Sequence, residues 1–329
     1  MIHRREFLVS AIATTMAPLA AFSQSITGQR RIGLMMAIGP DDAEGALRVD
    51  EFRRSFAQGG WEDGRNAAIE IGWYKGSIHL AGTIAKDFID RKVDVIVVNG
   101  TPGLEAIRTL GTTIPVVFVV VSNPIGAGYV SNLARPGANI TGFSTFEPEI
   151  AGKWLQLLTQ AVPGIKNVNM LIDAKAVGLQ SLWRAIAEIA PQHGIKAHPA
   201  FASTWAEIEQ ALQAIAGQEA PGLIVTPSPI NTVNRAKLIA IANSSRIPAI
   251  YPFRFYVRDG ALLAYGFNAA DQFRRAATYV ARILAGEAPG NLPVQPPSLF
   301  EFGVNLKTAK AMGIEMPRSL IIAADEVVE

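Results

Sequence analysis

The chain has 329 residues, of which 49% are hydrophobic and 18% charged, and its formal net charge is +2. This length allows two domains of ordinary size, and the composition excludes a largely disordered protein. Because 30 cations and 28 anions nearly cancel, no strong field favours nucleic acid or an anionic membrane surface. The absence of cysteine excludes disulfides, thiol catalysis, cysteine-type zinc sites and a lipid-modified amino-terminal cysteine.

The amino terminus has the layout of a secretory signal peptide. Arg4 and Arg5 precede an uncharged apolar run over 7–22, which ends among small residues. This run is shorter than the ~20 residues that a membrane-spanning helix needs. The arginine pair resembles a twin-arginine export signal, although His3 stands where Ser or Thr is usual. We expect a cleaved signal peptide over 1–23 and a soluble, periplasmic, monomeric mature protein.

From residue 31 onward, short apolar strands alternate with amphipathic helices. The first series predicts strands at 31–36, 67–74, 93–98, 116–121 and 139–143, and helices at 44–58, 80–91 and 103–110. Two of these strands are apolar on both faces, which is typical of a parallel sheet covered by helices on both sides.

The pattern then restarts. It predicts helices at 148–161, 180–193, 205–216 and 231–243, and strands at 168–172, 195–200, 222–226 and 247–251. Two successive series of similar size predict an α/β protein with two doubly wound parallel-sheet domains side by side.

A third section follows, with a strand at 261–265, a long helix at 269–284, a stretch rich in Pro and Gly at 286–297 and a last strand at 299–305. It fits a chain that returns to the first lobe and then to the second, which makes three crossings that form a hinge. It fits equally a plain carboxy-terminal extension of the second domain, and the pattern alone leaves both open.

Several segments carry a family likeness. They include Gly64-Arg65-Asn66, Asn99-Gly100-Thr101-Pro102, Ser122-Asn123-Pro124-Ile125-Gly126, Arg135-Pro136-Gly137-Ala138-Asn139, Ala249-Ile250-Tyr251-Pro252-Phe253 and Asn305-Leu306-Lys307-Thr308-Ala309. Together, and in this order over essentially the whole mature chain, they resemble the ABC-transporter substrate-binding family typified by tryptophan/tyrosine receptors. Many of those relatives carry a Glu where this chain has Phe255, so the ligand can differ.

The resemblance implies a type I periplasmic-binding-protein fold with three interlobe crossings. Lobe one is then expected to comprise 28–144 plus 262–288, and lobe two 145–261 plus 289–329. The resemblance also implies a small-molecule ligand between the lobes, an ABC permease in the inner membrane as partner, and no catalysis. We expect neither a cofactor nor a metal ion, and no nucleic acid partner.

Ligands of open parallel sheets bind beyond the carboxyl ends of the strands, where helix N-termini present free N–H groups. Ten candidate ligand-binding residues follow from this rule. They are Asn99, Thr101, Ser122, Asn123, Ser144, Ser228, Tyr251, Arg254, Tyr265 and Asp271. Arg254 is the candidate carboxylate clamp and Asp271 the candidate counter-charge for an ammonium group.

Each candidate also has a structural interpretation. Thr101 can cap a helix, Ser122 and Asn123 can form a tight turn, and strand-end tyrosines can pack in the core. Both charges can be ordinary solvated groups, and Asp271 can be an acidic residue at a helix N-terminus.

An enzyme is disfavoured by the absence of a catalytic motif. His3, His79, His193 and His198 include no pair at metal-ligand spacing, and no phosphate loop or nucleophile elbow is present. A repressor would need an amino-terminal helix-turn-helix where this chain has an export signal. A periplasmic sensor that presents its ligand to a membrane receptor stays open as an alternative to transport. The resemblance and the strand-end aromatic residues favour an aromatic amino acid, or a similar flat carboxylate, as ligand.

Overall fold

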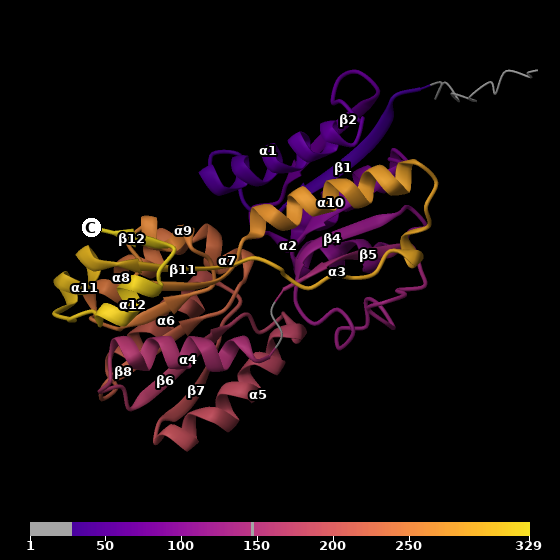
Figure 1. Ribbon diagram of the computed structural model, residues 1–329. Helices are drawn as coiled ribbons and strands as arrows, with labels where there is room; N and C mark the ends of the chain where they lie inside the picture. Colours follow the sequence, from indigo (N-terminus) through magenta and orange to yellow (C-terminus); the bar gives the residue numbers. More distant parts are fainter. Residues whose placement is uncertain (1–27, 146–147) are drawn as a thin grey trace, which may run out of the picture.

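Two separate β-sheets, each packed against helices, organise the chain into two lobes (Figure 1). The computed structural model describes residues 28–145 and 148–329. The signal peptide expected over 1–23 lies outside these residues. Within the described ranges, no helix combines the length and the apolar character needed to cross a bilayer. The expected α/β fold of two doubly wound lobes is confirmed.

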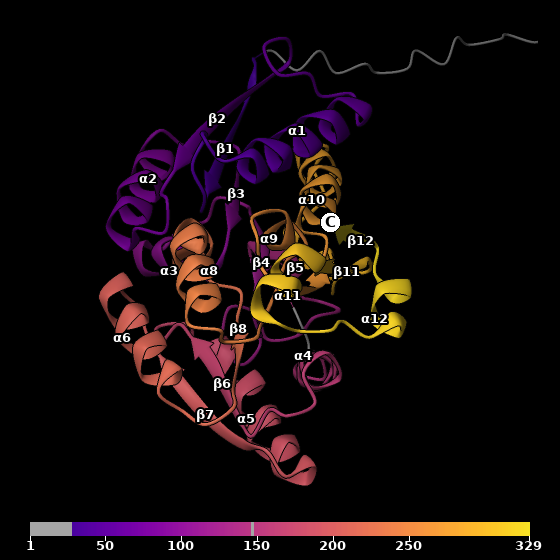
Figure 2. The ribbon, with the colours of Figure 1, turned by 90° about the vertical axis from the view of Figure 1, so that its left-hand side faces the viewer.

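Lobe one contains a five-stranded parallel sheet in the order β2-β1-β3-β4-β5. Its strands are β1 (Arg30–Met36), β2 (Ala67–Trp73), β3 (Val95–Asn99), β4 (Val116–Val121) and β5 (Ile140–Ser144). Its helices are α1 (Ala43–Gln58), α2 (Ile78–Asp90), α3 (Thr101–Leu110) and α10 (Ala269–Leu284). All five residues of β3 are buried, as its unbroken apolar run requires in a sheet covered on both faces. Helices α1 and α10, far apart in the sequence, lie side by side on this lobe (Figure 2).

Lobe two contains a seven-stranded sheet in the order β12-β11-β10-β9-β8-β6-β7. Its strands are β6 (Asn167–Ile172), β7 (Lys196–Phe201), β8 (Pro221–Val225), β9 (Ala249–Tyr251), β10 (Leu263–Phe267), β11 (Phe300–Asn305) and β12 (Glu326–Val328). Its helices are α4 (Ile150–Ala161), α5 (Gln180–Ile189), α6 (Trp205–Ala216), α7 (Pro229–Val233), α8 (Arg235–Ser244), α9 (Phe255–Arg258), α11 (Leu306–Met312) and α12 (Arg318–Ala323). The strands β6 to β10 are parallel to one another, whereas β11 runs antiparallel to β10 and β12 runs parallel to β11.

Two helices of lobe two differ from their predictions. The helix expected over 180–193 ends as α5 at Ile189, and a 3-10 turn follows over Ala190–His193. The helix expected over 231–243 is divided into α7 and α8, with Asn234 between them at φ −102° and ψ 11°. The Asn234 side chain donates a hydrogen bond to the carbonyl of Ile230 at 2.9 Å. Such local bonding to the backbone competes with the regular helix.

The chain crosses between the lobes three times. It passes from β5 to α4, from β10 to α10, and from Gln295, which is bridged to Phe143 of β5, to β11. The boundary expected at 262 assigns β10 to lobe one, whereas the structure pairs this strand with β9 and β11 of lobe two. The boundary expected at 289 is likewise too early, because Leu292 is buried in the core of lobe one. Strand pairing decides the first point and core packing the second, and an apolar pattern in the sequence does not indicate which lobe a segment joins.

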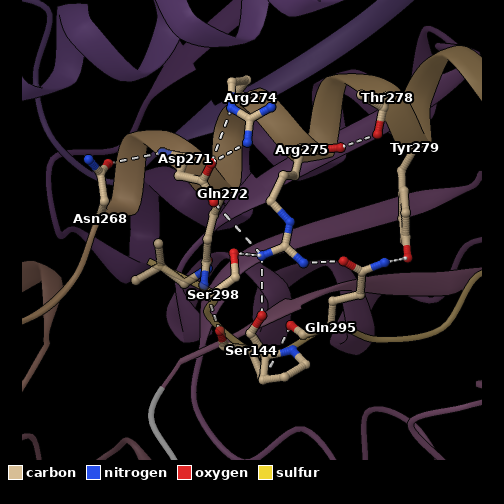
Figure 3. Close-up of polar contacts among 12 residues, drawn as sticks. Ser144, Asn268, Asp271, Gln272, Arg274, Arg275, Thr278, Tyr279, Gln295 and Ser298 are labelled. Atoms are coloured by element: carbon tan, nitrogen blue, oxygen red, sulfur yellow. Dashed lines mark hydrogen bonds and ion pairs between the residues drawn. The ribbon is translucent and has the colours of Figure 1, made fainter. Parts of the chain in front are cut away.

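Gln272 of α10 connects the crossings to the sheet of lobe one (Figure 3). Its side chain is 1% exposed, and its Nε2 donates to the carbonyl of Ser144 at 2.7 Å. Its Oε1 accepts the backbone N–H of Val120 at 2.9 Å. Val120 lies at an irregularity in the β4–β5 pairing with φ +59°, a conformation that a β-branched residue rarely adopts. The side chain of Gln272 thus satisfies a backbone N–H that the sheet leaves unpaired.

Candidate ligand-binding site

A pocket lined by residues of both lobes lies between them. Lobe one lines it with Ala37, Ile38, Arg48, Asn99, Gly100, Thr101, Pro102, Val120 and Ser122. Lobe two lines it with Asp173, Ala176, Leu179, Pro227, Ser228, Pro229, Thr232 and Phe253. Except for Arg48, these residues lie at or beyond the carboxyl ends of strands or in the short helices that follow, as expected for an open parallel sheet.

Polar groups of lobe one are held in place at the strand ends. The Asn99 side chain is 2% exposed, and its Oδ1 accepts the N–H of Ala37 at 3.3 Å. The buried hydroxyl of Tyr74 donates to the carbonyl of Asn99, and burial raises the pKa of this phenol. Thr145 donates to the Ser122 hydroxyl at 2.8 Å, which leaves the Ser122 proton free for another acceptor.

Thr101 does not cap helix α3. Gly100 is the N-cap residue, with φ +89°, and Thr101 is the first helical residue. A Cβ at Gly100 would lie 3.1 Å from the Tyr74 hydroxyl and 3.5 Å from Pro229 Cγ of the other lobe. Glycine is therefore required here both by backbone conformation and by close packing. Thr101 is then available to face the pocket that it lines.

Arg48 is a charged residue on the buried face of α1. Its side chain is 4% exposed, and its Nε donates to Glu44 at 2.9 Å. Its Nη2 atom is buried and has no hydrogen-bond partner in the described part of the chain. The guanidinium carbon lies 5.7 Å from the ring centre of Phe253, which belongs to lobe two. A buried charged donor without an acceptor is costly, and a guanidinium binds a carboxylate well, so this atom suits a ligand carboxylate.

Asp173 is the charged pocket residue of lobe two, and its side chain is held by neutral donors. Ser203 donates its hydroxyl to Oδ1 at 2.8 Å, and the backbone N–H of Lys175 donates to the same atom at 3.1 Å. Ser228 donates to Oδ2 at 3.1 Å. Asp173 is 8% exposed. The pocket therefore has an acidic group on one lobe and a basic group on the other.

The comparisons with known proteins agree with this architecture. Residues 44–328 match the sequence model of the ABC transporter substrate binding protein family. The chain belongs to this family. The tyrosine-binding protein of Clostridioides difficile (strain R20291) is 24% identical over 293 residues, which cover 87% of this chain and 82% of that protein.

Two solved structures show the same fold. An ABC domain in complex with L-Trp from Streptococcus pneumonia is 20% identical, with a TM-score of 0.84 over 92% of this chain and 100% of that one. A ligand-free, open substrate binding protein with adhesive properties from Clostridium difficile is 25% identical, with a TM-score of 0.66 over 91% of this chain and 99% of that one.

Of the ten residues selected from the sequence, the structure brings Asn99, Thr101, Ser122 and Ser228 together in the pocket of this substrate-binding protein. Asn123 lies in a turn instead, with φ +42° and its Oδ1 accepting the N–H of Gly126 at 2.9 Å. This is the tight-turn interpretation.

Three further candidates lie in the hinge or the core. Ser144 lies in the hinge, where its N–H donates to the carbonyl of Gln295 at 3.0 Å. Tyr251 is 1% exposed and stacks on Tyr256, with 5.0 Å between ring centres. Tyr265 stacks on Phe300 at 6.0 Å.

The two charged candidates have partners elsewhere. Arg254 lies 3.2 Å from a carboxylate oxygen of Glu301 and 3.3 Å from one of Glu326, and it lines a second pocket between the lobes, which shares Phe253 with the first. Asp271 lies in the first turn of α10, where it pairs with Arg274. The structure thus places Arg254 and Asp271 outside the pocket that Arg48 and Asp173 line.

Sequence reasoning did not single out Arg48 or Asp173. Asp173 is in a strand-end loop that the carboxyl-end rule selects, but no property of the sequence distinguishes it within that loop. Arg48 has a recognisable signal, because it shares helical spacing with Val49, Phe52 and Phe56 on the apolar side of α1. A single charged residue on such an apolar stripe predicts a buried side chain with a specific interaction partner.

The two lobes touch each other around the pocket. Asp42 of lobe one forms an ion pair with Arg235 of lobe two, and both side chains are less than one-fifth exposed. Burial opposes the charge on Arg235, but its hydrogen bonds to Asp42 and Asp259 outweigh this effect and raise its pKa. Gly178 of lobe two packs against the backbone of Ser122 of lobe one. These contacts describe a conformation in which the lobes are closed on the pocket.

Proposed function

We propose that this protein is the periplasmic solute-binding receptor of an ABC uptake transporter and binds an aromatic amino acid between its lobes. The observation that carries the proposal is the unpartnered Nη2 of the buried Arg48 in the interlobe pocket. An α-carboxylate would accept its hydrogen bond, with neutral donors such as Ser122 and Thr101 nearby. The tyrosine- and tryptophan-binding relatives support this ligand class.

Binding would proceed by hinge closure without chemistry. The ligand first contacts one lobe, and the second lobe then adds contacts and excludes water. The TM-score of 0.84 to the L-Trp complex exceeds the 0.66 to the ligand-free open structure, although the open protein has the higher sequence identity. This order supports the closed interpretation of the present conformation. The closed form would then dock on the permease of the inner membrane, after export directed by residues 1–23.

Calorimetric titration with L-tyrosine and L-tryptophan tests the proposal. Arg48→Ala should weaken binding roughly 10- to 150-fold, the effect of losing a charged hydrogen bond. Arg254→Ala is the matched control, because it removes the same group from a site outside the pocket, and it should keep affinity within about threefold. L-Tyrosinamide, which lacks the carboxylate, should bind the unaltered protein as weakly as L-tyrosine binds Arg48→Ala.

If Arg254→Ala weakens binding and Arg48→Ala does not, Arg254 is the residue that binds the carboxylate, as predicted from the sequence. Absence of binding of both amino acids to the unaltered protein would exclude an aromatic amino acid as ligand. The amide probe requires no substitution, so the result does not depend on the folding of the Arg48 variant.

A further inference from the structure

The ion pair between Asp42 and Arg235 joins the two lobes outside the ligand pocket. Asp42 precedes α1 of lobe one, and Arg235 is the first residue of α8 of lobe two. Their side chains are 15% and 18% exposed, and Arg235 Nη1 donates to Asp42 Oδ2. Neither is among the described residues that line the interlobe pocket. Their contact therefore depends on the closure of the lobes and not on the chemistry of the ligand.

The Asp42 side chain is held in place by its own lobe. Asp42 is the N-cap residue of α1, and its Oδ1 accepts the N–H of Glu44 at 3.0 Å. This bond uses one carboxylate oxygen and leaves the other for Arg235. Because the N-cap bond lies within lobe one, opening of the lobes does not break it. The carboxylate is thus ordered before the lobes close, which lowers the entropic cost of pairing.

The Arg235 side chain is held in the same way by lobe two. Its Nε donates to Asp259, its Nη1 also donates to the carbonyl of Thr232 at 3.1 Å, and its guanidinium carbon lies 5.3 Å from the ring centre of Phe255. The helix dipole disfavours a positive charge at the N-terminus of α8, so Arg235 does not serve to stabilise that helix. An ion pair that leaves water stabilises a conformation only when its geometry and its other hydrogen bonds compensate for the desolvation. Both lobes supply such bonds here.

We propose that Asp42 and Arg235 form an interlobe latch, an ion pair that stabilises the closed conformation whatever ligand is bound. A ligand enclosed between the lobes leaves only after they open, and opening must separate the pair. The latch therefore slows ligand release by a similar factor for every ligand, and it leaves the choice between ligands to the pocket. Since the pair forms after the ligand has entered, the association rate does not depend on it.

The test uses Asp42→Asn and Arg235→Gln, alone and together. Asparagine is as good an N-cap residue as aspartate, so Asp42→Asn keeps the cap of α1 and removes the charge. In stopped-flow experiments, L-tyrosine and L-tryptophan should each dissociate roughly 10- to 150-fold faster from either single variant, by the same factor for both amino acids. Association rates should stay within about threefold. The double variant should lose less than the product of the two single losses, because the pair can be lost only once.

X-ray scattering without ligand supplies a second measurement. If the latch acts independently of ligand, the radius of gyration of the ligand-free protein should be larger in Asp42→Asn, because fewer molecules are closed. Glu287→Gln is the matched control, since Glu287 lies 2.6 Å from Arg282 in an ion pair within lobe one. It should leave the rates and the radius unchanged.

Three outcomes would count against these expectations in different ways. If the pair only supports the fold of its own loops, Asp42→Asn lowers the melting temperature and slows association, and the latch is overturned. Unchanged dissociation rates together with an unchanged ligand-free radius also overturn it. If neither amino acid binds the unaltered protein, the proposed function fails, and the ligand-free scattering then tests the latch by itself: an unchanged radius overturns it and a larger one supports it.

Discussion

Gly178 offers a direct test of lobe closure, because its neighbour across the pocket is backbone. A Cβ at this position would lie 2.8 Å from the carbonyl carbon of Ser122 and nearer still to its oxygen. Residue 178 belongs to lobe two and Ser122 to lobe one, so this clash exists only while the lobes are closed. Forced overpacking costs about 1–3 kcal/mol, and neither backbone can turn away as a flexible side chain would. Gly178→Ala should therefore reduce the closing equilibrium by roughly 5- to 150-fold.

The apparent dissociation constant should rise by the same factor, since affinity scales with the population of the binding-competent state. Titration with L-tyrosine measures this constant, and X-ray scattering at saturating ligand measures the radius of gyration, which should decrease less in the variant. Gly164→Ala is the control, because a Cβ there meets no atom within 4 Å. If Gly178→Ala binds and compacts like the unaltered protein, the closed packing described here is not the ligand-bound packing, and the reasoning is refuted.

Two further predictions concern buried polar groups. Gln272→Ala should lower the melting temperature by several degrees and weaken ligand binding, because it leaves the Val120 N–H and the Ser144 carbonyl unpaired, at a cost of about 1–3 kcal/mol each. Thermal unfolding measures the first effect and calorimetric titration the second. An unchanged melting temperature would contradict the hydrogen-bond assignment. Tyr251→Phe should keep or raise the melting temperature, because the Tyr251 hydroxyl is buried without a partner in the described structure. If denaturant unfolding shows that the free energy of unfolding falls by more than about 1 kcal/mol, that hydroxyl has a bound water or another acceptor.

Most of the fold could be predicted because the determining signals are local. The apolar run 95–98 of β3 and the all-apolar strand β4 predict a sheet covered on both faces, and the intervening helices have clear amphipathic spacing. The membership of β10 could not be predicted in this way. Its sequence fits either sheet equally well, and the choice depends on hydrogen bonds to β9 and to β11, which lies more than thirty residues later. Local periodicity carries no information on such long-range pairing.

The neutral pocket residues and the charged ones differ in how far sequence could locate them. Asn99 and Ser122 follow from strand ends alone, because the carboxyl ends of parallel strands must meet at one edge. A charged residue at a strand end cannot be assigned to the pocket in this way, since an Arg or Asp at that position is equally typical of a solvated surface. Arg254, which follows β9, is neutralised by Glu301 and Glu326, two residues of the β11–β12 pair that no local pattern links to it.

A charged residue within the apolar stripe of a helix predicts a binding-site residue more specifically than a charged residue at a strand end does. Burying an arginine costs free energy that a surface position would avoid, so its place on the inner face of α1 must be compensated by partners. Glu44 supplies one partner and the ring of Phe253 another, yet the buried Nη2 has an unused donor on a side chain that lines the interlobe pocket. Asp173 lines the same pocket from the other lobe, where Ser203, Ser228 and the Lys175 N–H donate to its carboxylate. A ligand carboxylate would satisfy the unused donor of Arg48, which the packing of the two lobes leaves without an acceptor in the described part of the chain.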